Sequence, residues 1–216
     1  MISQWVEITE DLDDDTPLMT ITALISGGLA LVIEFMLTVP ALGVHPFGRV
    51  LVPVAVVVTF SVALTNYRGL FGDGHSLERV AVAVGMAYAA FLISSVLSLL
   101  LDDFFVGLHM ADWAIYTLVG VYGGGGAHLT VEIVRGLSLK GLFQLLVVTL
   151  SGGFVVSMIS VGSPDWWRDS LSWMGYDDQS GYVFNSTLIV SGMVLGAYGA
   201  GLVRLLRAAD AADHAR

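Results

Sequence analysis

The chain has 216 residues, of which 56% are hydrophobic and only 13% are charged. Soluble domains carry about 25% charged residues, and a mean hydropathy of +0.79 is hard to reconcile with a water-soluble core and surface. The composition therefore excludes a soluble domain and predicts an integral membrane protein.

The charged residues are biased toward acid. Fourteen Asp and five Glu face eight Arg and one Lys, which gives a net charge of −10. This balance argues against a nucleic-acid partner, because phosphates require basic patches. It resembles the composition of extreme halophiles such as halophilic archaea; drift in a GC-rich genome is the alternative. With no cysteine, disulfides and Cys-ligated zinc are excluded, and we expect no cofactor or metal.

The N-terminal residues 1–17 are rich in acid and contain no Lys or Arg. A secretory signal needs a basic region before its apolar stretch, so we predict an acidic cytoplasmic tail instead. A second short tail is expected at 208–216.

Six stretches are long and apolar enough to cross a bilayer as helices, which takes about 20 residues each. In chain order they are about 18–39, 47–66, 78–101, 112–134, 139–162 and 183–207. They are continuously apolar rather than alternating, so a β-barrel is not expected. We predict an all-α, six-transmembrane-helix bundle that forms one membrane domain over 18–207.

Positive charge predicts the orientation, because Lys and Arg collect on the cytoplasmic side. With six spans, the two tails and the second and fourth loops share one side. Seven basic residues lie there: Arg68, Arg79, Arg135, Lys140, Arg204, Arg207 and Arg216. Arg49 and Arg168 lie on the other side. We expect both termini in the cytoplasm and a multi-pass protein of the cell membrane.

The loop before the last span is predicted to contain an external amphipathic helix. Ser163 and Pro164 suit its start and Gly175 suits its end. Its apolar side is formed by Trp166, Trp167, Leu171, Trp173 and Met174. Because Trp prefers the membrane interface, we expect the helix to anchor there. A lid over a ligand cavity is the alternative.

Ionisable side chains within a span are costly, so each is a candidate for function. The candidates are Glu34, His128, Glu132 and Arg68. Glu34 and His128 differ by about 15 Å in depth at 1.5 Å per residue, so a shared site is not expected. His128 and Glu132 face the same way. We expect an interfacial charge network with Arg68 or Arg135; a metal or proton-relay site is the alternative, although zinc needs more ligands.

Several glycines mark possible helix contacts or hinges: Gly120, Gly123, Gly124, Gly125, Gly126, Gly192 and Gly196. Gly120 with Gly124, and Gly192 with Gly196, have the small-xxx-small spacing of closely packed membrane helices. The run from Gly123 to Gly126 weakens a helix. A broken fourth span lining a cavity is therefore the alternative to close packing.

One segment resembles a known family. It consists of Trp166 to Gly175, then Phe184-Asn185-Ser186-Thr187 and Gly192. It is similar, over about residues 145–205, to an uncharacterised prokaryotic multi-pass membrane family catalogued as domain of unknown function 998. In that family the segment follows an early span; here it precedes the last one. No activity is established there. The resemblance implies that Ser172, Gly175, Phe184 and Asn185 form a structural or binding unit on the outer face.

Three functions remain open. The first is a non-enzymatic module that binds membrane lipids or a small solute, or that serves as a subunit of a homo-oligomer or larger membrane complex. The second is a small transporter or proton/cation-coupled permease using the glycine-rich span. The third is an intramembrane lipid-modifying enzyme. A closed bundle with an exposed Gly192–Gly196 stripe would favour the first, and a water-accessible cavity reaching His128 would favour the second.

Overall fold

The structure is a computed structural model that describes residues 46–68, 76–104, 112–161, 171–176 and 180–214. Within these ranges it is all-α, as predicted. The helices are α3 (Pro46–Asn66), α4 (Ser76–Phe104), α5 (Asp112–Arg135), α6 (Leu139–Ser160) and α7 (Gly181–His214), with one 3₁₀ helix, η3 (Leu171–Gly175). Each of the five α-helices overlaps one of the last five predicted stretches. The first stretch, with Glu34, lies outside the described residues.

Three of these helices are long and apolar enough to cross a membrane. They are Ser76–Leu101 within α4, Leu139–Ser160, and Gly181–Ala211 within α7. The apolar part of α3, Val50–Asn66, is shorter. Helix α5 is 24 residues long, but its glycines, His128 and Glu132 make it less apolar. The chain is therefore a helical membrane protein, in agreement with its composition.

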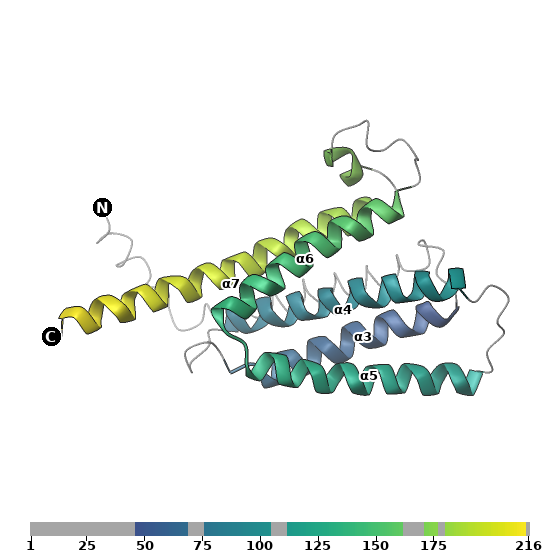
Figure 1. The fold of residues 1–216 in the computed structure, drawn as a ribbon, viewed down its shortest axis with the longest axis horizontal. Helices are drawn as coiled ribbons and strands as arrows, with labels where there is room; N and C mark the ends of the chain where they lie inside the picture. Colours follow the sequence, from purple (N-terminus) through teal and green to yellow (C-terminus); the bar gives the residue numbers. More distant parts are fainter. Residues whose placement is uncertain (1–45, 69–75, 105–111, 162–170, 177–179, 215–216) are drawn as a thin grey trace, which may run out of the picture.

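Helix α4 lies at the centre of the described helices. It packs against α3, α6 and α7, whereas α5 packs against α3, and α6 runs along α7. Figure 1 shows α5, α3 and α4 running side by side, with the α6–α7 pair inclined to them on the side of α4. Helices α5 and α6 diverge from the short connection 136–138, and α4 lies between them (Figure 1). The two consecutive helices therefore have little direct contact.

The connection between α5 and α6 is built from local hydrogen bonds. The Gly136 N–H donates to the carbonyl of Glu132 at 3.2 Å, which closes the last turn of α5. Ser138 is the N-cap of α6, and its hydroxyl oxygen accepts from the Gly141 N–H at 3.3 Å. Such a cap satisfies one of the free N–H groups at a helix start, so α6 begins after a connection of only three residues, 136–138.

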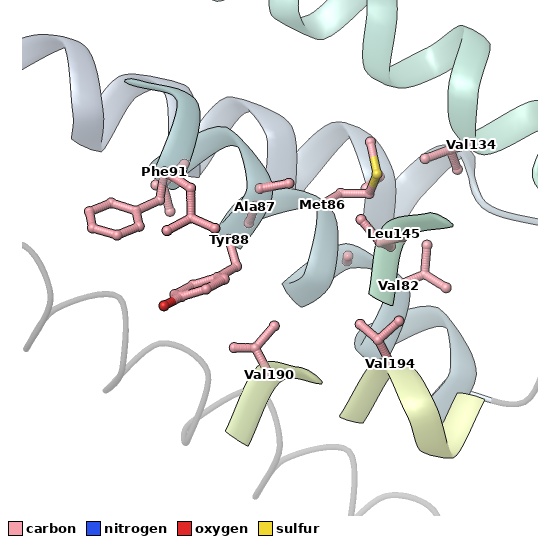
Figure 2. Close-up of a cluster of buried hydrophobic side chains, with 14 of the residues drawn as sticks. Val82, Met86, Ala87, Tyr88, Phe91, Val134, Leu145, Val190 and Val194 are labelled. Atoms are coloured by element: carbon pink, nitrogen blue, oxygen red, sulfur yellow. The ribbon is translucent and has the colours of Figure 1, made fainter. Parts of the chain in front are cut away.

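The apolar core lies where α4 faces α6 and α7. Figure 2 shows Val82 and Met86 of α4 near Leu145 of α6, with Val194 of α7 close by, whereas Phe91 lies farther along α4 beside Tyr88. Glycine allows the helices to approach closely here: a Cβ atom on Gly85 would lie 2.6 Å from Val194 and 3.2 Å from Leu145. Dispersion contacts of this kind hold membrane helices together where lipid is as apolar as the side chains.

A polar contact joins α4 to α7 inside this core. The hydroxyl of Tyr88 lies 2.7 Å from Oγ1 of Thr187, 3.1 Å from Oγ of Ser186 and 3.0 Å from the carbonyl oxygen of Val183. Hydrogen bonds between membrane helices contribute about 0.6 kcal/mol on average and up to about 1.7 kcal/mol.

We expect Tyr88→Phe to lower the free energy of unfolding by about 1 kcal/mol, because the Tyr88 hydroxyl contacts three polar atoms of α7. Reversible unfolding of the purified protein in mixed micelles measures this loss. Tyr176→Phe is the control, since the Tyr176 side chain is 87% exposed and should change little. Equal stability of the two variants would contradict the role of Tyr88.

Two predicted boundaries differ from the structure. Helix α7 continues to His214, beyond the predicted end at 207, because the alanines that follow Arg207 favour helix. The segment before α7 is predicted as an amphipathic α-helix, yet its described part is the five-residue 3₁₀ helix η3. Met174 is fully buried there, so it packs inside the protein rather than facing the membrane interface. Trp166 and Trp167 lie outside the described residues, and Trp173 is half-buried.

Candidate functional site

A groove lies between α5 and α6, with α3 and α4 as its floor. Its volume is about 680 Å³, and its lining is almost entirely apolar. Residues from all four helices border it, including Val58, Ala89, Ile93, Val121, Leu129 and Val148. This volume lies within the range of about 300–1,000 Å³ that small-molecule sites occupy. The groove exists because α5 and α6 diverge over α4.

The groove continues along α4 and α6. A second depression of about 480 Å³ shares Ala89, Ile93 and Val148 with the first and extends to Leu100 and Val155. From Gly141 to Val155 the α6 wall is about 21 Å long, at 1.5 Å per residue. The hydrocarbon core of a bilayer is about 30 Å thick. An extended apolar chain bound in the groove would therefore span most of the hydrocarbon core of the bilayer.

Glycine forms part of the α5 wall. Gly125 and Gly126 border the groove, and a Cβ atom on either would meet nothing within 4 Å among the described residues. Gly123, by contrast, faces Val54 of α3, whose Cγ1 would lie 3.4 Å from such a Cβ. Helix α5 is continuous from Asp112 to Arg135. The glycine run therefore widens the groove without breaking the helix.

Most hydroxyl groups at the groove are already hydrogen-bonded. Ser94 donates to the Ala90 carbonyl at 2.6 Å, so its contact of 3.0 Å with the Tyr122 hydroxyl uses the Tyr122 proton. Thr130 donates to the carbonyl of Gly126 at 2.7 Å. Thr59 also borders the groove and is 5% exposed. Its hydroxyl forms no hydrogen bond within the described part of the chain.

The predicted His128–Glu132 pair lies outside the groove. Both side chains are exposed, and neither borders the two depressions. Within the described ranges neither forms an ion pair. Arg135 instead donates to Oδ1 of Asn66 at 3.2 Å, which joins the ends of α5 and α3, and Arg68 is exposed after α3. The expected charge network is not seen among the described residues, because the Arg135 side chain reaches toward α3.

The four glycines with membrane-contact spacing also face outward. A Cβ atom on Gly120, Gly124, Gly192 or Gly196 would meet nothing within 4 Å in the described structure. Close packing within the chain occurs at Gly85 and Gly153 instead. A Cβ atom on Gly153 of α6 would overlap the side chain of Thr187 of α7. The outward glycines are therefore available to a partner.

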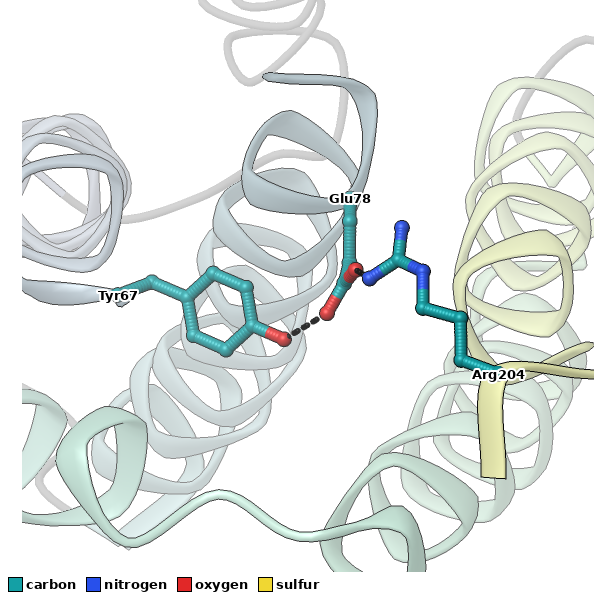
Figure 3. A network of polar contacts seen from close by, with 3 residues as sticks. All are labelled: Tyr67, Glu78 and Arg204. Carbon is teal, nitrogen blue, oxygen red and sulfur yellow. Dashed lines mark hydrogen bonds and ion pairs between the residues drawn. The ribbon is translucent and has the colours of Figure 1, made fainter. Parts of the chain in front are cut away.

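A buried ionic network was not predicted from the sequence. Glu78, in the first turn of α4, is 3% exposed. It accepts a hydrogen bond from the Tyr67 hydroxyl, and Arg204 of α7 donates to its Oε2 at 2.6 Å. Figure 3 shows the carboxylate between the two partners. Through Glu78, the network links Arg204 of α7 to the start of α4 and to Tyr67, which follows α3.

The sequence contains a signal for this network. Glu78 and Arg204 have opposite charge, and the predicted topology places both at the cytoplasmic ends of their spans, hence at the same depth. The positive-inside rule uses Arg204 for orientation alone and does not pair it with Glu78. The sequence gives no signal for Thr59, because a threonine in an apolar helix ordinarily donates its hydroxyl proton to a carbonyl of its own helix.

The structure brings together most of the family-like residues. Asn185 donates from Nδ2 to the carbonyl of Gly175 at 3.1 Å. Phe184 packs on Phe154 of α6 with ring centroids 5.6 Å apart, and its ring closely approaches Gly175. Ser180 donates to the Met174 carbonyl at 2.9 Å. The side chain of Ser172 lies outside the described residues. Gly175, Phe184 and Asn185 thus form one unit that holds η3 against α7.

No metal site is apparent in the described part of the chain, since no three His, Asp or Glu side chains come together there. Comparison with protein-family models, curated proteins and solved structures finds no match to this chain.

Proposed function

We propose that this chain is a non-enzymatic, six-span membrane protein that binds an apolar chain molecule of the bilayer in the groove between α5 and α6. The groove is the observation that carries the proposal. It is apolar along its length. Its lining includes Ile93, Leu129 and Val148, whose side chains are exposed rather than buried in the protein core. A groove of this kind at membrane depth excludes water and accepts hydrocarbon.

The proposed topology has both termini in the cytoplasm of a cell-membrane protein. The three apolar spans support it, together with α3 and α5, which pack alongside them. The positive-inside rule assigns one set of helix ends to the cytoplasm. Arg68, Arg79, Arg135 and Lys140 lie within a turn of these ends, and Arg204 lies near the predicted end of the last span. The relation to the family of domain of unknown function 998 is part of the proposal and is supported by the contacts among Gly175, Phe184 and Asn185.

Transport is less well supported than binding. A permease using the glycine-rich span would need a pathway that reaches His128 or Glu132, and neither of these residues borders the groove. Helix α5 is also unbroken at its glycines, whereas transporter sites commonly use interrupted helices.

A second role is favoured by the exposed glycines of α7. Gly192 and Gly196 are spaced by one turn and leave that face of the helix flat. Small-xxx-small faces allow helices of different chains to approach closely. We propose that this face supports assembly into a homo-oligomer or a larger membrane complex.

The Gly126→Leu variant tests the binding function. Its side chain would enter the groove, because nothing lies within 4 Å of the Cβ position. Native mass spectrometry of protein released from membranes should show a retained apolar molecule on the wild type and little on Gly126→Leu. The matched control is Gly124→Leu, which changes the helix propensity of α5 equally but does not border the groove. Retention by Gly126→Leu at the wild-type level would contradict the proposal.

A further inference from the structure

Thr59 is the one described threonine whose hydroxyl has no hydrogen bond. The other five, Thr65, Thr117, Thr130, Thr149 and Thr187, each donate to a backbone carbonyl three or four residues earlier in their own helix. That arrangement is the ordinary way to satisfy a threonine in an apolar helix. The Thr59 hydroxyl does not donate to the equivalent carbonyl of Ala55, although the residue is only 5% exposed.

The unpaired hydroxyl is open to the groove. In the described part of the chain, Ser98 Oγ is the one side-chain polar atom that is both sealed and without a partner. The Thr59 hydroxyl is not among such fully buried atoms, and Thr59 lines the groove. Since Tyr122 and Thr130 already use their protons, Thr59 is the hydroxyl there with a proton to donate. An unsatisfied hydroxyl in an apolar medium is energetically costly, and a bound acceptor would remove this cost.

The depth of Thr59 restricts the acceptor. Thr59 lies one residue from the middle of the apolar stretch Val50–Asn66, hence within about 2 Å of its midpoint along the helix. The hydrocarbon core is about 30 Å thick, so phospholipid ester groups begin about 15 Å from the midplane. A phospholipid in its normal position therefore cannot present an oxygen to Thr59. A charged headgroup would be expensive at this depth.

We propose that the groove binds a neutral, headgroup-free lipid that carries a carbonyl group, and that Thr59 donates a hydrogen bond to this carbonyl. A chain-bearing quinone has this chemistry: a ring ketone that dissolves in the hydrocarbon core and an apolar tail. The tail lies along α4 and α6, and the ring lies against the glycines of α5. This assignment rests on the proposed binding function and names its ligand class.

Competition between two matched compounds tests the assignment. The full-length protein in phosphatidylcholine nanodiscs is labelled with hexadecane that carries a photoactivatable diazirine. Decylbenzoquinone and decylbenzene, which differ by the two carbonyl groups, are then titrated as competitors. One hydrogen bond should make the quinone the better competitor by about threefold to tenfold. In Thr59→Val the two compounds should compete equally.

Two further variants control for structure. Thr59→Ser keeps the hydroxyl and should restore the preference for the quinone. Thr117→Val removes an exposed hydroxyl that is bonded to its own helix and should keep the wild-type preference. An unchanged preference in Thr59→Val, or equal competition in the wild type, overturns the assignment of the carbonyl. Absence of labelling on α5 and α6 of the wild type overturns the binding function itself, so the two failures are distinguishable.

Discussion

Gly153→Ala is expected to lower the free energy of unfolding by about 3 kcal/mol, because α6 and α7 are in contact at this position. Gly153 is buried, and an added Cβ atom would overlap the Thr187 side chain. Thr187 cannot easily turn away, since it donates to the Val183 carbonyl at 2.6 Å and contacts the Tyr88 hydroxyl. The helices must separate, and the contacts of Phe154 with Phe184 weaken with them.

Gly192→Ala is the matched control for Gly153→Ala. It makes the same chemical change in α7, at a glycine where a Cβ atom meets nothing within 4 Å in the described structure. Alanine favours helix over glycine by up to about 1 kcal/mol, so this variant should be neutral or slightly more stable. Reversible unfolding in mixed micelles compares the two. If Gly153→Ala unfolds at the same denaturant concentration as Gly192→Ala, the close α6–α7 contact is wrong.

Glu78→Gln is expected to destabilise the protein by about 3 kcal/mol, since breaking a buried ion pair leaves the other charge without compensation. The carboxylate is buried beneath α7, and Arg204 donates to it at 2.6 Å. The amide cannot replace the carboxylate as the counter-charge of this guanidinium. We expect the C-terminal half of α7 to detach first, which limited proteolysis after Arg204 and Arg207 would detect.

Two comparisons define the cause of the Glu78 effect. Glu132→Gln makes the same change at an exposed residue without an ion pair in the described ranges, and should alter stability by less than about 0.5 kcal/mol. The double variant Glu78→Met with Arg204→Met should recover much of the loss, because replacing both charges by apolar side chains removes the desolvation cost. A Glu78→Gln protein as stable as Glu132→Gln would show that the pair has no structural role.

The helices could be predicted from the sequence because apolar runs and their breakers decide them locally. The bounds of α3 and α5, for example, lie within one residue of the predicted stretches 47–66 and 112–134. The helix type of η3 could not be predicted from its own residues, because its last carbonyls, those of Met174 and Gly175, accept hydrogen bonds from Ser180 and Asn185. These donors belong to the start of α7, not to the segment itself.

The candidate site was harder to predict, since it depends on how helices are placed. The groove arises from the angle between α5 and α6, which no residue pattern encodes locally. Thr59 could not be predicted either, because its proposed role depends on the absence of a hydrogen bond from its hydroxyl, which only the structure reveals. The sequence predicted His128 and Glu132 as candidates because they are ionisable residues within a predicted span. In the structure both are exposed, whereas Glu78 is buried.

Mapping where a diazirine-bearing hexadecane labels the wild-type protein in nanodiscs tests the central claim most directly. The groove predicts that adducts concentrate on Val121, Leu129 and Val148, and that Gly126→Leu removes them while Gly124→Leu does not. Leu188 and Leu195 of α7, which are 46% and 53% exposed and lie outside the groove, report the background labelling by bulk lipid. Labelling of the groove residues at this background level, unchanged by Gly126→Leu, would contradict the binding function.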